Sequence, residues 1–78
     1  MEQSILPLNQ LPIGRKGQVL SLGGRQGRRM MDLGLVQGTV VEALQRSPAG
    51  DPVAYGIRGA VIALRKSDAA QIEVGVVP

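Results

Sequence analysis

The chain lacks two residue types on which small proteins and enzymes often rely. Its 78 residues include no cysteine and no histidine. Disulfide frameworks, Cys/His zinc sites, thiol nucleophiles and histidine-based acid–base catalysis are therefore excluded. Phenylalanine and tryptophan are also absent, and Tyr55 is the only aromatic residue. Recognition of RNA by stacking its bases on aromatic side chains is therefore not expected.

Long hydrophobic runs are missing as well. No apolar run exceeds five residues, whereas a membrane-spanning helix needs about 20. The sequence begins Met1-Glu2-Gln3-Ser4, without the basic region and long apolar stretch of a signal peptide. We expect a cytoplasmic protein that does not insert into a membrane.

The length predicts a single domain over residues 1–78. A domain of this size buries only about 60 to 65 per cent of the surface that its unfolded chain exposes. Its core supplies on the order of 3 to 5 kcal/mol unless a disulfide, a metal or a partner stabilises it. The composition leaves contact with a partner as the available support, and a homodimer is one such arrangement.

The charged residues are mildly unbalanced: nine are basic and six are acidic, which gives a net charge of +3. The acidic residues are scattered singly along the sequence, whereas a catalytic carboxylate pair or a hard-metal site needs several that converge. Lys16 and Lys66 are the only conceivable bases for a hydroxyl nucleophile. We therefore expect no catalytic residues, no metal ligands, no cofactor and no enzymatic activity.

Short runs of alternating or β-branched apolar residues dominate the rest of the chain, and they predict strands. Strands this short bury a common face by curling into a small barrel, which also removes most exposed edges. The opening segment, with two prolines, predicts a short turn that places Leu8 and Leu11 on one side. The fold class is thus mainly β, a barrel of about five strands, which the sequence places at 19–22, 39–46, 53–58, 60–65 and 72–76.

One short helix is predicted over 25–33, where Gly34 is the glycine expected in a left-handed closing position. Gly38 supplies a positive φ for the turn into the next strand. Gly14 and Gly17 are interpreted as turn residues that bracket Arg15-Lys16 ahead of the first strand. Two sets of residues complete the turns: a hairpin loop over 47–52 that includes Gly50, Asp51 and Pro52, and a one-turn helix over 67–70 with Ser67 as its cap.

The predicted helix carries side chains that the fold does not obviously need. Arg28 and Arg29 lie in its first half, where the helix dipole makes each exposed positive charge unfavourable by about 0.3 to 1 kcal/mol. Met30 and Met31 are adjacent, so a helix cannot point both at one core, and Met31 is expected to be exposed beside Leu35. These residues predict a partner contact. A solvated basic face that keeps the domain soluble explains the arginines equally well.

The order of these motifs resembles the FeoA family of ferrous iron transport accessory proteins. The resemblance spans nearly the whole chain and rests on its motifs in their order and spacing. They are Leu8-x-x-Leu11-x-x-Gly14-x-x-Gly17-x-Val19, the stretch 28–39 with Leu33-Gly34-Leu35 and Gly38-Thr39, Gly50-Asp51-Pro52, Leu64-Arg65 and Ala69-x-x-Ile72-x-Val74. The resemblance implies an SH3-like β-barrel and a cytoplasmic regulator that contacts FeoB, the GTP-binding membrane transporter for ferrous iron, and so works at the inner face of the membrane.

If the chain docks on such a transporter, we expect the contact to run through the predicted helix and the turn that follows it. The partner-binding residues would be Arg28, Arg29, Met31 and Leu35, and Arg28 or Arg29 would be the arginine to test if the family stimulates GTP hydrolysis. Two other classes of protein fit the composition: a basic SH3-like module that binds nucleic acid, and a metal-responsive regulatory module. Salt-dependent binding to DNA or RNA would favour the first, and direct binding of ferrous iron would favour the second.

Overall fold

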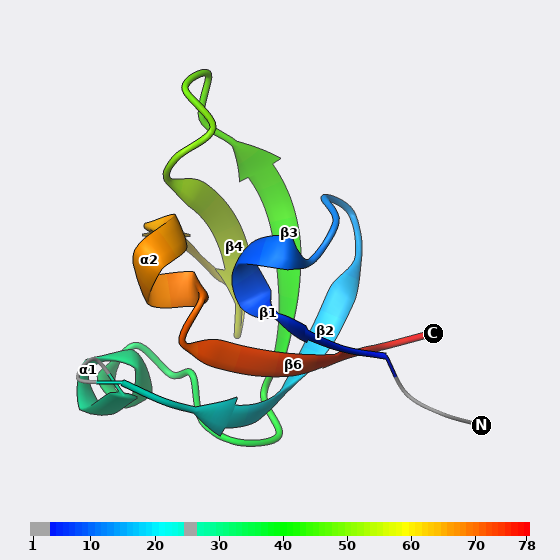
Figure 1. The fold of residues 1–78 in the computed structure, drawn as a ribbon, viewed down its shortest axis with the longest axis vertical. Helices are drawn as coiled ribbons and strands as arrows, with labels where there is room; N and C mark the ends of the chain where they lie inside the picture. The colour runs from blue at the N-terminus through cyan, green and yellow to red at the C-terminus, as the bar shows by residue number, and fades with distance from the viewer. Residues whose placement is uncertain (1–3, 25–26) are drawn as a thin grey trace.

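A computed structural model of the chain describes residues 4–24 and 27–78. Six antiparallel strands form one curled sheet in the order β1-β6-β2-β3-β4-β5. Figure 1 shows β3 and β4 side by side, with β2 and β6 crossing below them. The elements are β1 (Ile5–Pro7), η1 (Leu8–Gln10), β2 (Lys16–Leu22), α1 (Gly27–Asp32), β3 (Val40–Arg46), β4 (Val53–Ile57), β5 (Ala60–Leu64), α2 (Lys66–Ala69) and β6 (Ile72–Val76).

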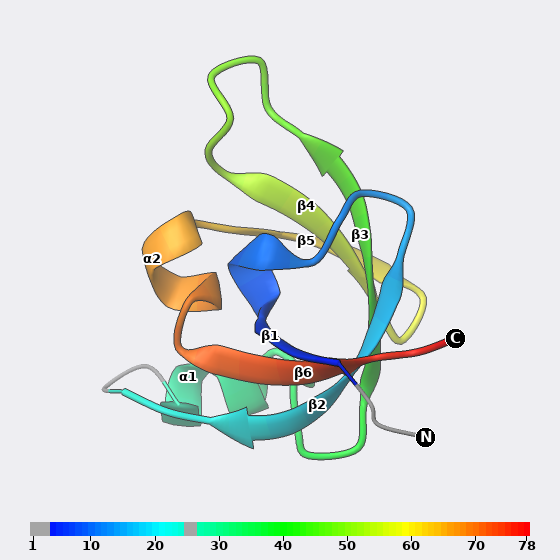
Figure 2. The same cartoon turned by 45° about the vertical axis from the view of Figure 1, so that its right-hand side comes forward.

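The prediction of a mainly β barrel with one short helix and one-turn helices is confirmed, with one strand more than expected. The additional strand is β1, which pairs with β6 over three residues and forms an edge of the sheet. Pro7 lies at its end, and an edge strand is where a sheet tolerates a residue without an N–H group. The turn predicted after it is η1, and both Leu8 and Leu11 are buried. Figure 2 shows η1 beside α2, over the opening that the sheet encloses.

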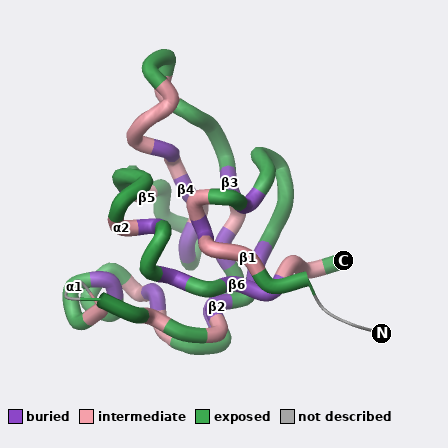
Figure 3. Tube along the Cα trace, in the orientation of Figure 1, coloured by how far each residue is buried: buried purple, intermediate pink, exposed green. Residues whose placement is uncertain are grey.

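The core lies inside the curled sheet and is built from alternate residues of the strands. In β4 the alternation predicted from the sequence holds throughout, because Val53, Tyr55 and Ile57 are buried. In β5 the inner face is buried at one end only: Leu64 is buried, whereas Ala60 is exposed. Figure 3 shows buried and exposed stretches alternating along the chain. The core therefore covers the Leu64 end of β5 and leaves the Ala60 end exposed.

Tyr55 is a large residue of this core, and its hydroxyl group is buried with the ring. The side chain is 1% exposed, and its hydroxyl donates a long hydrogen bond of 3.4 Å to the carbonyl oxygen of Leu8. Burial raises the pKa of the phenol, because the charged phenolate would lose its hydration; the charge of Arg46 opposes this shift in part. The neutral phenol is thus the form that the barrel holds.

Gly17 has a different purpose from the turn role predicted for it. It lies inside β2 and is buried. A Cβ atom added to it would lie 2.9 Å from Cγ2 of Val74, on the neighbouring strand β6. The residue is small because the side chain of Val74 occupies the space that a Cβ atom would need, and that requirement does not show in a turn pattern. Gly14, with φ of 89°, does occupy a turn.

Candidate functional site

Helix α1 presents the side chains that the sequence singled out for partner contact. Met30 is 1% exposed and packs in the core, whereas its neighbour Met31 is 54% exposed. Arg28 and Arg29 are exposed on the same helix. We call Arg28, Arg29 and Met31 the helix surface. Their exposure agrees with the prediction, whereas binding of a partner by them stays a prediction.

Leu35 does not belong to the helix surface, and its predicted place there is wrong. Its side chain is 0% exposed. The helix ends in two backbone hydrogen bonds of the Schellman type: the Gly34 N–H donates to Met31 O at 2.9 Å, and the Leu35 N–H donates to Met30 O at 3.0 Å. With Gly34 at φ 93°, this ending turns the chain back so that Leu35 joins Met30 in the core.

The turn after the helix is held by the barrel. Gly38 has φ of 92°, as predicted, and its N–H donates to Val19 O at 2.8 Å. Thr39 closes the same segment, because its Oγ1 donates to Gly34 O at 3.3 Å. Residues 34–39, which follow α1, are therefore held in place by a hydrogen bond to β2 and by one between Thr39 and Gly34.

The hairpin loop between β3 and β4 has a structural function that the sequence pattern only partly revealed. Gly50 has φ of 88° and its N–H donates to Ser47 O at 2.8 Å, which closes the loop. Asp51 reaches further, because its Oδ1 accepts the Lys66 N–H at 3.0 Å, at the start of α2. The N-cap residue of α2 is therefore Arg65 and not Ser67, which lies inside the helix; Arg65 makes no side-chain cap hydrogen bond, and Asp51 supplies the capping carboxylate instead. A cap from 15 residues upstream gives no local sequence signal.

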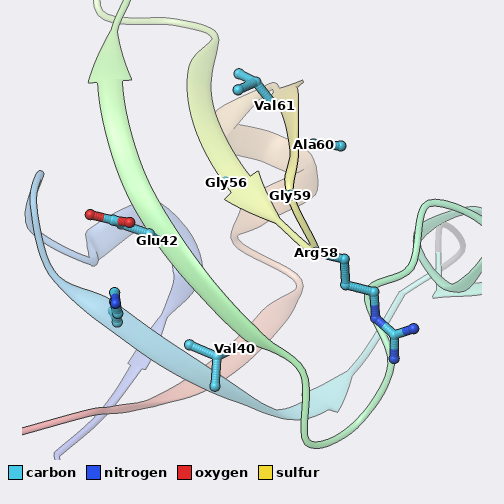
Figure 4. A pocket seen from close by; sticks show the side chains of 8 residues that line it. Val40, Glu42, Gly56, Arg58, Gly59, Ala60 and Val61 are labelled. Atoms are coloured by element: carbon cyan, nitrogen blue, oxygen red, sulfur yellow. The ribbon is translucent and has the colours of Figure 1, made fainter.

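The sequence analysis missed a groove of about 390 Å³ on the outer face of the sheet (Figure 4). Its centre is a row of residues that are direct partners across four strands: Lys16 faces Glu42, Glu42 faces Gly56, and Gly56 faces Val61. Gly56 has no side chain, so it leaves a gap in this row, and the side chain of Leu44 lies beside the gap, with its Cδ1 3.4 Å from the position that a Cβ on Gly56 would occupy. The lining residues, which we call the sheet groove, are Lys16, Val40, Glu42, Gly56, Arg58, Gly59, Ala60 and Val61.

Arg58 joins the sheet groove to the end of the helix. It forms the two-residue turn between β4 and β5 with Gly59, and both have positive φ, 52° and 81°. This is the backbone of a type I′ turn, in which asparagine or glycine is the usual residue. Its Cδ lies 3.6 Å from the position that a Cβ on Gly34 would occupy. Figure 4 shows the side chain pointing from the hairpin toward the segment that follows α1.

The described residues offer little for chemistry of other kinds. Across residues 4–24 and 27–78, no three acidic side chains come together in a way that could hold a metal ion. None of the helices in this part of the chain is long and apolar enough to cross a membrane. The exposed surface thus offers two candidate binding regions, the helix surface and the sheet groove, and Arg58 of the groove approaches the end of the helix at Gly34.

Comparison with known proteins identifies relatives over nearly the whole chain. The model of the FeoA domain family matches residues 6–76. The Fe(2+) transport protein A/Fe(2+) transporter FeoB fusion protein of Porphyromonas gingivalis is 33% identical over 72 residues, which cover 90% of this chain and 8% of that protein. This chain thus spans a small part of that relative.

Two solved structures are similar in fold and sequence. The FeoA-like protein of Clostridium acetobutylicum has a TM-score of 0.89 and 35% identity, and the match covers 100% of this chain and 92% of that one. The FeoA of Stenotrophomonas maltophilia, described as a prokaryotic SH3 domain protein and solved with zinc, has a TM-score of 0.77 and 29% identity, with 86% of each chain covered. The barrel described above is therefore SH3-like.

Proposed function

The chain belongs to the FeoA domain family, and on that premise we propose that it is a cytoplasmic accessory protein of bacterial ferrous iron uptake that regulates an FeoB-type transporter by contact. The observation that carries the proposal is the relative in which FeoA and FeoB are parts of one polypeptide. Two domains joined in one chain are kept at high effective concentration, which is useful when they work by touching. An FeoA protein that is not fused to FeoB would need sufficient binding affinity to form the same contact between two chains.

The helix surface supports the proposal because it is costly for the fold and available to a partner. Arg28 lies at the start of α1, where the helix dipole disfavours positive charge, whereas Arg29 lies in the last turn of this short helix, where the dipole does not disfavour it. Met31 is 54% exposed beside them, and methionine adapts its shape to a partner surface. A contact between this surface and an acidic, partly apolar face of the transporter would bury the methionine and neutralise the arginines.

The contact we propose is regulatory and non-enzymatic. The chain has no histidine or cysteine, and the described acidic residues form no cluster. An arginine donated to the phosphate site of the transporter is the one chemical contribution that the helix surface could make. Docking alone, which shifts the transporter between states that differ in affinity for this chain, is sufficient for regulation.

The test is charge reversal on the helix surface. We expect the double variant Arg28→Glu/Arg29→Glu to fold normally and to lose about tenfold or more in affinity for the transporter, because each arginine at the centre of a contact contributes strongly to binding. Binding would be measured on transporter-containing membranes, and ferrous iron uptake in cells whose own copy is deleted. The matched control, Arg15→Glu/Lys66→Glu, changes the net charge equally but leaves the helix surface intact.

The possible outcomes distinguish a wrong function from a wrong docking surface. Wild-type binding and uptake in the folded Arg28→Glu/Arg29→Glu variant would show that a different face docks. Unchanged ferrous iron uptake in cells that lack the whole chain would refute the function itself. Equal losses in the test and control variants would mean that net charge, and not the helix surface, governs the contact.

A further inference from the structure

Strand β5 is an unprotected edge of the sheet. In the described structure it pairs with β4 on one side and with no strand on the other. Edge strands are commonly guarded by a lysine, a proline or a bulge. The sequence of β5, Ala-Val-Ile-Ala-Leu, contains no charged residue and no proline, and its register with β4 is regular. Such an edge is suited to accept another strand.

The turn geometry determines which backbone groups are free. Residues that close a two-residue hairpin exchange hydrogen bonds, and bonded pairs alternate along an antiparallel ladder. Ile57 and Ala60 close this hairpin. The N–H and C=O groups of Val61 and Ala63 consequently face away from β4, toward the open side. Both residues are exposed, and the side chain of Val61 is 70% exposed, the most among the large hydrophobic residues described.

The sheet groove adjoins this edge on the outer face. Its wall on the β5 side consists of Ala60 and Val61, and its floor is Gly56. Side chains of an added strand would alternate between the two faces of the sheet, so those on the outer face would lie beside this wall. An apolar side chain there would cover Val61, which nothing in the described chain covers.

Charge identifies the kind of strand that fits. Arg58 and Arg65 stand at the two ends of β5 and are both exposed, and no acidic residue lies between them. Two copies of β5 paired antiparallel through Val61 and Ala63 would bring Arg58 of one chain to the same end of the pair as Arg65 of the other, and like charges close together across a strand pair are destabilising. A segment with carboxylates at both ends would instead complement these arginines. Of the groove residues, only Glu42 is acidic, and it faces Lys16 across the β2–β3 ladder.

We propose that the free edge of β5, with the adjoining sheet groove, binds an extended segment of a partner protein in which alternating apolar residues are flanked by carboxylates. The segment adds a strand to the sheet and pairs with the outward N–H and C=O groups of Val61 and Ala63. Arg58 and Arg65 attract the carboxylates at the two ends of the segment and so favour an acidic partner. This surface is separate from the helix surface and the proposal does not depend on the identity of the transporter.

The test uses the full chain and two synthetic peptides. The probe is the blocked peptide acetyl-DTVTVTD-amide, and its control is acetyl-KTVTVTK-amide. We expect the acidic peptide to shift the NMR signals of the Val61 and Ala63 amides, to slow their hydrogen exchange, and to bind more weakly as salt is added. The lysine peptide should bind about three- to tenfold more weakly, because two exposed charge pairs become repulsive.

Two variants assign the effect to the edge. Ala63→Pro removes an outward N–H without removing a bond to β4, and edge strands tolerate proline at such positions. It should abolish binding while leaving the fold intact. Should this variant fail to fold, Arg58→Glu/Arg65→Glu provides the second measure, since it should reverse the preference between the two peptides. The control Arg15→Glu should bind the acidic peptide as the wild type does.

Three results would overturn the proposal. The first is the absence of shifts at Val61 and Ala63 with the acidic peptide at millimolar concentration. The second is equal binding of the two peptides, which would remove charge as the selector. The third is a concentration-dependent shift of the same amides without any peptide, which would show that a second copy of the chain occupies the edge.

Discussion

The two faces of the β3–β4–β5 half of the sheet come from alternate residues of the same strands, yet they have opposite properties. On the inner face, Val53, Tyr55 and Ile57 are at most 4% exposed and form the core. On the outer face, Val40 is 47% exposed and Val61 is 70% exposed, around the gap at Gly56. The inner face determines whether the chain folds. The outer face is free to bind because the fold does not use it.

The largest expected effect is on the inner face. Replacing Ile57 by alanine should cost about 2 to 5 kcal/mol in the free energy of unfolding, because it deletes buried methyl groups and leaves a cavity. The matched change on the outer face, Val61→Ala, should stay within about 0.5 kcal/mol. Urea unfolding measures both. If Ile57→Ala unfolds the domain, the milder change Ile57→Val provides the measurement and should cost about 0.5 to 1.5 kcal/mol. An equal loss of unfolding free energy in the two variants would contradict the conclusion that the inner face, and not the outer face, stabilises the fold.

The sequence predicted the inner face well because burial follows a local period. Alternation identified the buried residues of β4, and adjacency of Met30 and Met31 in a helix required one of them to be exposed, which is Met31. Gly34 and Gly38 were predicted to need positive φ, and both have it. Each of these inferences depends on residues that are neighbours along the chain.

The outer face could not be predicted, because it depends on register between strands. The row through Glu42, Gly56 and Val61 exists only when three strands are aligned. The cap that Asp51 gives to α2 also crosses the chain, and Leu35 was misplaced because the Schellman ending redirects it. The exposed residues of the helix surface could thus be predicted from the sequence, whereas the sheet groove became visible only in the three-dimensional structure.

An intermediate effect is expected from the buried hydroxyl group of Tyr55 on the inner face. The pKa of Tyr55 is raised from 10.0 by burial, so the neutral phenol is favoured in the folded chain. This stabilisation is complete below about pH 10 and is lost as the pH rises through the raised folded pKa. We expect the wild type to lose stability above pH 10 more steeply than Tyr55→Phe, which should cost only about 0.5 to 1.5 kcal/mol at neutral pH.

The measurement is simple because Tyr55 is the only aromatic residue. Its absorbance titration can be followed in the folded chain and in urea, and the unfolding free energies of wild type and Tyr55→Phe compared from pH 7 to 11. Titration at the same pH in both states would refute the raised pKa. It would also mean that the inner face is open to water at this position.

The smallest expected effect is on the outer face and has the opposite sign. Arg58 has φ of 52°, a conformation that costs an ordinary residue about 1 kcal/mol and that asparagine tolerates. Arg58→Asn should therefore raise the free energy of unfolding by a few tenths to about 1 kcal/mol, measured by urea unfolding. The control Arg58→Ala removes the charge without relieving the backbone, so it should give no such gain. Destabilisation by Arg58→Asn would show that the packing of the arginine stem beside Gly34 outweighs the strain. A gain in stability accompanied by weaker binding of the acidic peptide would show that the chain keeps a strained arginine at this turn for binding.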